Sequence, residues 1–348
     1  MSTKTIGRRS FLAGTTGFVA AMAAPSVVRA QEKVVNLYSS RHYDTDERLY
    51  TDFTQATGIK VNRVEAQPDA LLERMKAEGA NSPADVFISV DAGRIERARE
   101  MGLLQPLNSS VIKTAVPANL RDPEDHWFGF SSRARVIMYN KDKVKVGDIS
   151  TYEDLADPKW KGKILNRSST HIYNQSLTGS ILAALGEAKT EAWCKGLVAN
   201  FAHPPKGGDR DQIRGCAAGE ADIAISNTYY LGNIIKKPDA KDADVLTIIG
   251  IIFPNQGDRG THANISGGGL AASAKNKENG IKFLEYLLTP AAQSYFAEGN
   301  DEYPVVAGVP LPKTLAAFGT FKQDQLNARV YARNNAEALK IMDRSGWK

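Results

Sequence analysis

The sequence has few of the residues on which common metal and catalytic motifs depend. Its 348 residues include two cysteines and five histidines. Neither cysteine has a CxxC partner, and the histidines are not spaced as zinc ligands are, which argues against a zinc site or thioredoxin-like chemistry. GxSxG, HExxH and Walker motifs are absent, so hydrolase and nucleotide-binding chemistry has no support. We therefore expect a protein that is not an enzyme.

The two cysteines, Cys194 and Cys216, predict one disulfide if the mature protein enters an oxidising compartment. In the chain-entropy account, this bond closes a loop of about twenty residues and stabilises the fold by about 3 kcal/mol. Two buried free thiols are the alternative, because cysteine is among the residues most often buried.

A long apolar run is also missing near the N-terminus. Residues 11–24 are moderately apolar, but this stretch is too short to span a bilayer and contains two glycines. It follows the pair Arg8 and Arg9 and precedes a small-x-small cleavage site at residues 28–30. This order is typical of a secretory signal. We predict that residues 1–30 are a twin-arginine signal peptide and that the protein is periplasmic.

Without that segment the chain has no excess charge of either sign. The whole sequence has 44 basic and 39 acidic residues, and residues 1–30 hold four of the basic residues and no acidic one. The mature chain therefore has 40 against 39, a net charge of +1. A nearly neutral protein gives no electrostatic reason to expect a nucleic acid or an anionic membrane as its partner.

Short β-rich runs alternate with amphipathic helical segments in the first third of the mature chain. The first run, residues 34–39, precedes a helix at 44–56 that has Asp44 as a candidate N-cap, and a strand at 84–90 follows later. This alternation predicts a parallel sheet with helices on both faces. The long β-rich run at 127–139 then indicates a crossover between two α/β lobes.

Two later segments carry clear patterns of their own. The continuous β-branched run at 245–252 predicts a buried strand, and residues 275–288 predict an amphipathic helix that stops at Pro290. Two α/β lobes are in keeping with the length of the chain and with its 42% hydrophobic and 24% charged residues.

Tyrosines stand at three of the predicted strand-to-helix junctions, which are the places where open α/β sheets bind ligands. They are Tyr43, Tyr173 and the adjacent pair Tyr229 and Tyr230. A phenol has an ordinary pKa of about 10, but a hard trivalent cation favours anionic oxygen and can hold it deprotonated. Adjacent side chains of a strand point to opposite faces, so only a turn lets both members of the pair converge. The alternative is one tyrosine in the core and one on the surface.

Two arginines, Arg133 and Arg135, alternate with apolar residues in the run at 127–139 and therefore share one face of that strand. They are either solvated surface charges or cations that offset negative charge beside tyrosinates. We consider Arg133 a candidate outer-sphere neighbour of a metal site.

The chain resembles the ferric-ion-binding periplasmic proteins of ABC transporters, in particular the cyanobacterial FutA-like type. The resemblance covers essentially the whole mature chain. It is carried by NLYSSRHY at 36–43, PADVFISVDAG at 83–93, STHIYNQS at 169–176 and SNTYYLGN at 226–233. The double-tyrosine block in this context is a specific signal.

The resemblance implies a type II periplasmic-binding-protein fold in which two lobes close like a hinge on one Fe(III). The lobes are expected at 31–128 with 263–300 and at 129–262 with 301–348. The implied metal ligands are Tyr43 from the first lobe and Tyr173, Tyr229 and Tyr230 from the second, with His42 or water completing the sphere. Delivery to an inner-membrane ABC permease by a monomeric protein is implied as well.

One departure bears on the ligand set. Another branch of this family uses a histidine and a glutamate with an external anion, whereas the corresponding stretch here reads Ser89-Val90-Asp91. This favours a cage made of tyrosines. Fe(III) with three phenolates is neutral, and a fourth phenolate leaves a charge of −1, which we expect Arg133 or Arg41 to balance.

Two other kinds of function remain open from the sequence. The same fold can bind an oxyanion, which calls for helix N-termini and arginines, or a polyamine, which calls for acidic residues. An exported oxidoreductase with a tyrosinate-bound metal is the alternative from another class, and it would need an open coordination position.

Overall fold

The computed structural model describes residues 33–348 with the exception of His42. The predicted signal peptide and His42 therefore lie outside the described residues. Within the described part, no helix is both long and apolar enough to cross a membrane. Residues 33–348 form one unit, so the boundaries of the two lobes stay a prediction.

Three parallel strands form one end of the sheet. β1 (Val34–Ser39) pairs with β2 (Lys60–Glu65) on one side and with β3 (Val86–Val90) on the other. Val35 and Leu37 of β1 are fully buried, as alternate residues of a half-covered strand should be. The predicted strands and their parallel pairing are confirmed for this part of the chain.

Helices α1 (Glu47–Thr57), α2 (Pro68–Glu78) and α3 (Ala92–Glu100) follow these three strands in turn. α1 ends at Gly58, whose φ of 69° is the left-handed conformation that glycine adopts without strain. The helix start predicted at Asp44 is wrong by three residues, because a tighter 3₁₀ turn occupies Asp44 to Asp46 before α1 begins.

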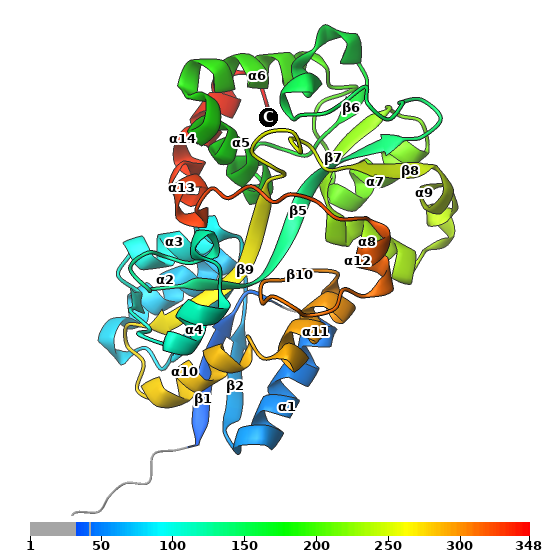
Figure 1. The fold of residues 1–348 in the computed structure, drawn as a ribbon. Helices are drawn as coiled ribbons and strands as arrows, with labels where there is room; N and C mark the ends of the chain where they lie inside the picture. The colour runs from blue at the N-terminus through cyan, green and yellow to red at the C-terminus, as the bar shows by residue number, and fades with distance from the viewer. Residues whose placement is uncertain (1–32, 42) are drawn as a thin grey trace, which may run out of the picture. The chain divides into compact units, whose positions relative to one another are not determined.

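Strand β5 (Phe128–Asn140) joins the two parts of the sheet. Its first half pairs antiparallel with β9 (Ala263–Ala271), and its second half pairs with β7 (Ile223–Asn227) and β8 (Ile249–Ile252). Figure 1 shows β5 and β9 side by side through the middle of the described residues. The predicted long strand is confirmed, and its antiparallel pairing with β9 makes the sheet mixed rather than parallel. Its role as a crossover between two lobes stays a prediction.

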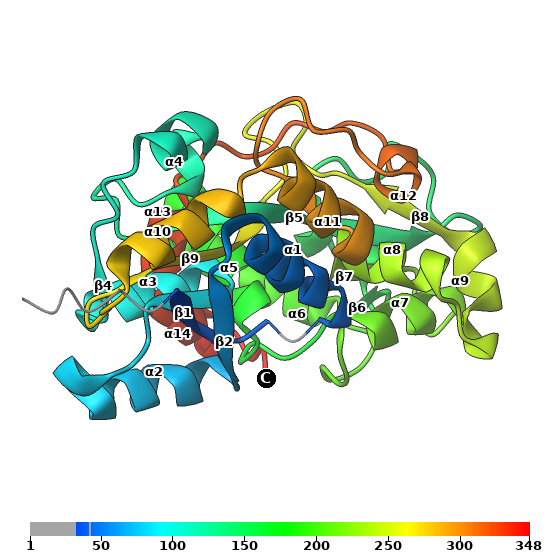
Figure 2. The same cartoon turned by 90° about the horizontal axis from the view of Figure 1, so that it is seen from below.

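The sheet runs in the order β2-β1-β3-β9-β5-β7-β6, and off this path β8 and β10 pair with β5 and β4 pairs with β9. The short strands are β4 (Leu104–Gln105), β6 (Ile164–Leu165) and β10 (Tyr303–Pro304). The remaining helices are α4 (Ser110–Ala115), α5 (Ile172–Leu185), α6 (Glu187–Ala199), α7 (Asp209–Ala217), α8 (Thr228–Lys236), α9 (Ala243–Ile248), α10 (Lys277–Tyr286), α11 (Pro290–Asn300), α12 (Lys313–Ala317), α13 (Ala328–Arg333) and α14 (Asn335–Arg344). Figure 2 shows α11 beside α1, where the hydroxyl of Tyr295 donates to Asp52.

Beyond β5, apolar cores lie on both faces of the sheet. Ile137 of β5 packs with α5 and α6 on one face, and Met138 packs with α7 on the other. A third core lies around β1, β3 and β9. The C-terminal segment contributes to more than one core, because Tyr331 belongs to the core around β1 and Trp347 to the core around α5.

The strand predicted at 245–252 is wrong in its first half. α9 occupies Ala243–Ile248, and only Ile249–Ile252 form β8. Contacts with α7 lie at the start of this helix: Arg214 Nε donates to Asp242 Oδ1 at 2.6 Å, and Val245 packs in the same apolar core as Ile213. Tertiary packing here overrides the strand propensity of the β-branched residues.

The predicted disulfide between Cys194 and Cys216 is also wrong, because both thiols are free and buried. Cys194 belongs to the core on one face of the sheet, and Cys216 belongs to the core on the other face. The sheet thus separates the two residues, whereas a disulfide requires Cα atoms within about 7 Å. Burial raises the pKa of each thiol to about 12, which keeps both protonated at neutral pH.

We expect two free thiols per mature chain in protein purified without reductant. The measurement is a thiol-reagent titration, which should count both groups in denaturant and react slowly in the native protein because both groups are buried. The C194S variant should then count one thiol. A count of zero in denaturant for the unsubstituted protein would establish the bond and overturn the assignment.

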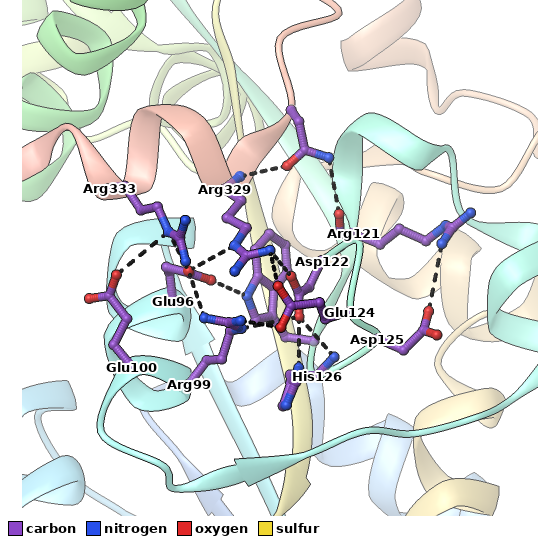
Figure 3. A network of polar contacts seen from close by, with 12 residues as sticks. Glu96, Arg99, Glu100, Arg121, Asp122, Glu124, Asp125, His126, Arg329 and Arg333 are labelled. Carbon is purple, nitrogen blue, oxygen red and sulfur yellow. Dashed lines mark hydrogen bonds and ion pairs between the residues drawn. The ribbon is translucent and has the colours of Figure 1, made fainter.

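A network of charged side chains ties α13 to α3 (Figure 3). Arg329 Nε lies 3.1 Å from Glu96 Oε1, and Arg333 Nε lies 3.0 Å from the same oxygen. Arg329 also reaches the buried Asp122, with its Nη1 3.2 Å from Oδ1. The other side of α13 packs against α5. The C-terminal segment therefore holds α5 in place relative to α3.

Close packing around β9 explains its run of glycines. A Cβ on Gly269 would lie 2.2 Å from the carbonyl oxygen of His126. We expect Gly269→Ala to lower the free energy of unfolding by about 1–3 kcal/mol, as overpacked sites do. Urea denaturation measures the change. Gly257→Ala is the control, because a Cβ at Gly257 meets nothing within 4 Å. Equal effects of both substitutions would refute the crowding argument.

Candidate functional site

The structure brings the tyrosines of the three junctions together. Tyr173 lies in the first turn of α5, and Tyr229 lies in the first turn of α8, directly after β7. Their hydroxyl oxygens are 3.2 Å apart, within hydrogen-bond distance. Tyr43, in the loop between β1 and α1, interacts electrostatically with both of these phenols. Residues far apart in the sequence thus form one group, which we call the tyrosine cluster.

The adjacent pair converges because it lies on a helix and not on a strand. β7 ends at Asn227, and both tyrosines belong to the first turn of α8. The ring centroids of Tyr229 and Tyr230 are 4.2 Å apart, and the ring planes are inclined by 32°. Tyr230 also interacts electrostatically with Tyr173. The predicted turn is therefore confirmed, and with it the convergence of the pair.

Two phenols of the cluster are buried, and those of Tyr43 and Tyr230 are partly buried. Tyr173 and Tyr229 are 6% and 5% exposed. Burial raises the pKa of Tyr43, Tyr229 and Tyr230 above the ordinary value near 10. Negative charge on neighbouring groups raises these pKa values further, because like charges disfavour ionisation. A metal ion that binds here must displace phenolic protons, and this requirement favours an ion of high charge.

Arg133 and Arg135 of β5 are both buried, 1% exposed, so neither is a solvated surface charge. The Cζ atom of Arg133 is 5.8 Å from the ring centroid of Tyr173 and 5.9 Å from that of Tyr229. The Cζ atom of Arg135 is 5.9 Å from the ring of Tyr173. The predicted shared face of the strand is thus confirmed, and this face lies against the tyrosine cluster.

Glu302 is a buried carboxylate that sequence reasoning missed. It lies directly before β10 and accepts from Arg41 Nη1 at 3.0 Å and from Arg133 Nη1 at 3.3 Å. The hydroxyl of Ser131 donates to it as well. An acidic residue next to a two-residue strand is the only local signal, and it does not reveal such partners. Glu302 therefore binds two arginines whose guanidinium groups lie against rings of the tyrosine cluster.

The charges of this group change the expected balance. Arg41 Nε is 2.8 Å from Asp46 Oδ2, and Arg41 and Arg133 share Glu302. Two cations and two carboxylates sum to zero. The expectation that Arg133 or Arg41 balances a fourth phenolate stays a prediction, and both guanidinium groups already have carboxylate partners.

Histidines contribute less than the sequence allowed. His42 lies outside the described residues, so its role as a ligand stays a prediction. Nδ1 of His171 accepts from the backbone N–H of Tyr173 at 3.3 Å, and burial lowers the pKa of His171 to about 3, which keeps it neutral. Among residues 33–348 apart from His42, no group of three or more histidines, cysteines or carboxylates could hold a metal ion. The phenols are thus the donor set that the described residues offer.

A pocket of about 460 Å³ opens beside the cluster. Tyr43 and Thr45 line one side, and Arg210, Asn233 and Lys236 line the other. Its size admits a hydrated ion or a small chelate. The tyrosine cluster is therefore accessible from solvent at Tyr43.

Removal of the Glu302 charge should destabilise the protein. Glu302→Gln leaves Arg41 and Arg133 without their shared carboxylate, and breaking a buried pair in this way costs about 3–5 kcal/mol. Urea denaturation at neutral pH measures the loss. The control is Glu337→Gln, which removes a partly exposed carboxylate that pairs with Lys340 and should change the midpoint little. A Glu302 variant as stable as the control would contradict the role of this carboxylate.

The same pair should make stability depend on pH. Burial alone would raise the pKa of Glu302, but the two guanidinium groups hold it below its usual range. A carboxylate with a lowered pKa stabilises the fold above its unfolded value, about 4.3, and this contribution is lost as the pH falls through the folded pKa. The Gln variant should lack that part of the acid dependence.

Known proteins share the sequence of this chain to different degrees. Residues 39–294 match the family described as bacterial extracellular solute-binding protein. The chain is similar to iron uptake protein A1 of Synechocystis sp., with 52% identity over 91% of this chain and 88% of that protein. It is also similar to iron uptake protein A2 of the same organism, with 47% identity over the full length of both.

A solved structure carries the similarity into three dimensions. The Trichodesmium protein IdiA (FutA), described in complex with iron and citrate ligands, superposes with a TM-score of 0.89 and 58% identity. The match covers 90% of this chain and all of that one. The fold described above is therefore shared with a protein whose structure contains iron.

Proposed function

The chain belongs to the family of bacterial extracellular solute-binding proteins, and we propose that it captures ferric iron through tyrosinate ligands. The tyrosines are Tyr43, Tyr173, Tyr229 and Tyr230, and His42 or water completes the coordination sphere. In this proposal the protein is a monomer, reaches the periplasm by the twin-arginine route and delivers its cargo to an ABC permease in the inner membrane.

The observation that carries this proposal is the convergence of phenols from separate strand-to-helix junctions. The hydroxyl oxygens of Tyr173 and Tyr229 are 3.2 Å apart. Two oxygens at this separation are both within reach of one small hard cation, whose bonds to oxygen are about 2 Å long. A merely structural pair of tyrosines has no need of further phenols beside it.

The electrostatics of the cluster favour a trivalent cargo. Each phenol must lose a proton to bind, and burial opposes that loss for Tyr43, Tyr229 and Tyr230. A trivalent ion offsets the cost of deprotonation more fully than a divalent ion, because its attraction to anionic oxygen is stronger. Fe(III) is accordingly the ion that we assign to the site.

The comparisons support a carrier and an uptake system. The relatives are named as iron uptake proteins and the more distant ones as ferric iron-binding proteins, for example in Neisseria meningitidis with 26% identity. These are names of transport proteins and not of enzymes. The partner that such an uptake system requires is a permease to which the protein delivers iron.

We expect a broad visible charge-transfer band when ferric citrate is added to the mature protein, complete at one equivalent. Tyr173→Phe and Tyr229→Phe should each diminish the band, because each removes a phenolate that bonds to the metal. Loss of an outer-sphere partner typically weakens metal binding by about 10–100-fold, so loss of a ligand should weaken it by more than about 100-fold. Absorption spectroscopy with a citrate competition titration measures both effects.

The matched control is Tyr295→Phe, which removes a hydroxyl that donates to Asp52 outside the tyrosine cluster. This variant should keep the full band and the full affinity. The absence of a band in the unsubstituted protein with any ferric source would mean that the tyrosines are structural. Oxyanion and polyamine binding would then be the next functions to test.

A further inference from the structure

Arg135 lies where the N-termini of three helices meet. Its Nη2 donates to Asn174 Oδ1 of α5 at 2.7 Å. Its Nη1 donates to Asp209 Oδ1, at the first residue of α7, at 2.9 Å, and to Asn227 Oδ1, directly before α8, at 3.1 Å. Asn174 follows Tyr173 in the chain, and Asn227 precedes Tyr229 by two residues. One guanidinium group thus holds the two helix starts that carry the tyrosines.

The bond to Asn227 replaces an ordinary helix cap. Asn227 is the N-cap residue of α8, but its side chain makes no capping bond to that helix. An asparagine at this position commonly stabilises its helix by about 1 kcal/mol through such a bond. Here its Oδ1 accepts from Arg135 instead. The start of α8 is therefore positioned through Arg135.

The cluster around Arg135 also carries a net positive charge. Asp209 Oδ1 pairs with Arg135, and Asp209 Oδ2 pairs with Nη1 of Arg167. Burial alone would raise the pKa of Asp209, but the two guanidinium groups hold it below its usual range. Two cations thus share one carboxylate, and the sum is +1. The group of Arg41 and Arg133 has no such surplus, because Asp46 and Glu302 neutralise it.

We propose that Arg135 is a positioning residue for Tyr173 and Tyr229, and that Arg135, Arg167 and Asp209 together supply the positive charge that a fourth phenolate requires. This inference rests on the proposed function. Fe(III) with four phenolates carries −1, and the +1 of this cluster balances it. The N-termini of α5 and α8 add partial positive charge at the same place.

The geometry explains why an arginine stands at position 135. A guanidinium group is planar and holds its donors in a fixed fork, so it can bind acceptors on three helices at once. A lysine carries the same charge on one ammonium group at the end of a flexible chain and cannot fix three acceptors in one plane. Position and charge can therefore be separated by substitution.

The charge is tested with Arg167→Gln and Asp209→Asn, which change the sum of the cluster from +1 to zero and to +2. A more positive surrounding favours Fe(II) over Fe(III). The reduction potential of the bound iron, measured by spectroelectrochemistry with mediators, should therefore fall in Arg167→Gln and rise in Asp209→Asn. We expect the ratio of ferric to ferrous affinity to change by about tenfold in each case, which corresponds to about 59 mV for one electron.

The positioning role is tested with Arg135→Lys, which keeps the charge. We expect a shifted charge-transfer band and an altered Fe(III) electron paramagnetic resonance spectrum, because Tyr173 and Tyr229 lose their common anchor. Arg167→Gln should keep the electron paramagnetic resonance spectrum, because Arg135 retains its bonds to Asn174 and Asn227. If Arg135→Lys does not fold, Asn227→Ala removes the anchor of α8 alone and should shift the band in the same way.

The control is Arg344→Gln, whose guanidinium pairs with Glu187 and Glu191 at the start of α6. The start of α6 directly follows the C-terminal end of α5. α5 has 14 residues and carries Tyr173 near its N-terminal end, so its C-terminal end lies about 20 Å from Tyr173. The variant should leave the potential and the spectra unchanged.

The outcomes separate this inference from the proposed function. If the unsubstituted protein gives no charge-transfer band, the proposed function fails and the inference fails with it. If the band is present but the potentials of Arg167→Gln and Asp209→Asn equal that of the control, the charge role is overturned. Spectra of Arg135→Lys and Asn227→Ala that match the unsubstituted protein overturn the positioning role.

Discussion

The structure depends on a buried carboxylate, Glu302, which holds two guanidinium groups away from water. A charge without a partner in such a place costs several kcal/mol, so Arg41 and Arg133 can be buried only because Glu302 and Asp46 are buried with them. Arg41 follows β1, Arg133 lies on β5, and Glu302 precedes β10. The same contacts that compensate these charges therefore hold three segments of the chain together next to the tyrosines.

The tyrosine cluster follows from the way in which an α/β sheet ends its strands. A strand that runs into a helix leaves its last side chains at the edge of the sheet, and the first turn of the helix points its N–H groups to the same edge. Tyr173 and Tyr229 occupy this position in α5 and α8. Phenols at helix N-termini are placed where negative charge is favoured, although burial raises the pKa of Tyr229 and so opposes its ionisation.

Local patterns predicted the parts of this arrangement that local physics decides. The helix starts beside Tyr173 and Tyr229 and the long strand β5 are properties of a few consecutive residues. The strand expected at 245–252 and the disulfide were wrong because both depend on how separate segments pack on the sheet, which local patterns do not show. Glu302 was missed for the same reason, since its partners lie more than 100 residues away in the chain.

β5 explains how one strand can serve both stability and charge. Arg133 and Arg135 point to the same face, but each belongs to a different group of charges. The group of Arg133 is neutral and joins segments of the chain, whereas the group of Arg135 keeps a charge of +1 and joins helix starts. Because the two groups are separate, the charge beside the phenols can be set by Asp209 and Arg167 without loss of the pair that holds β1, β5 and β10 together. In the proposed function, this arrangement lets Asp209 and Arg167 set the charge near the metal while the contacts of Glu302 stay in place.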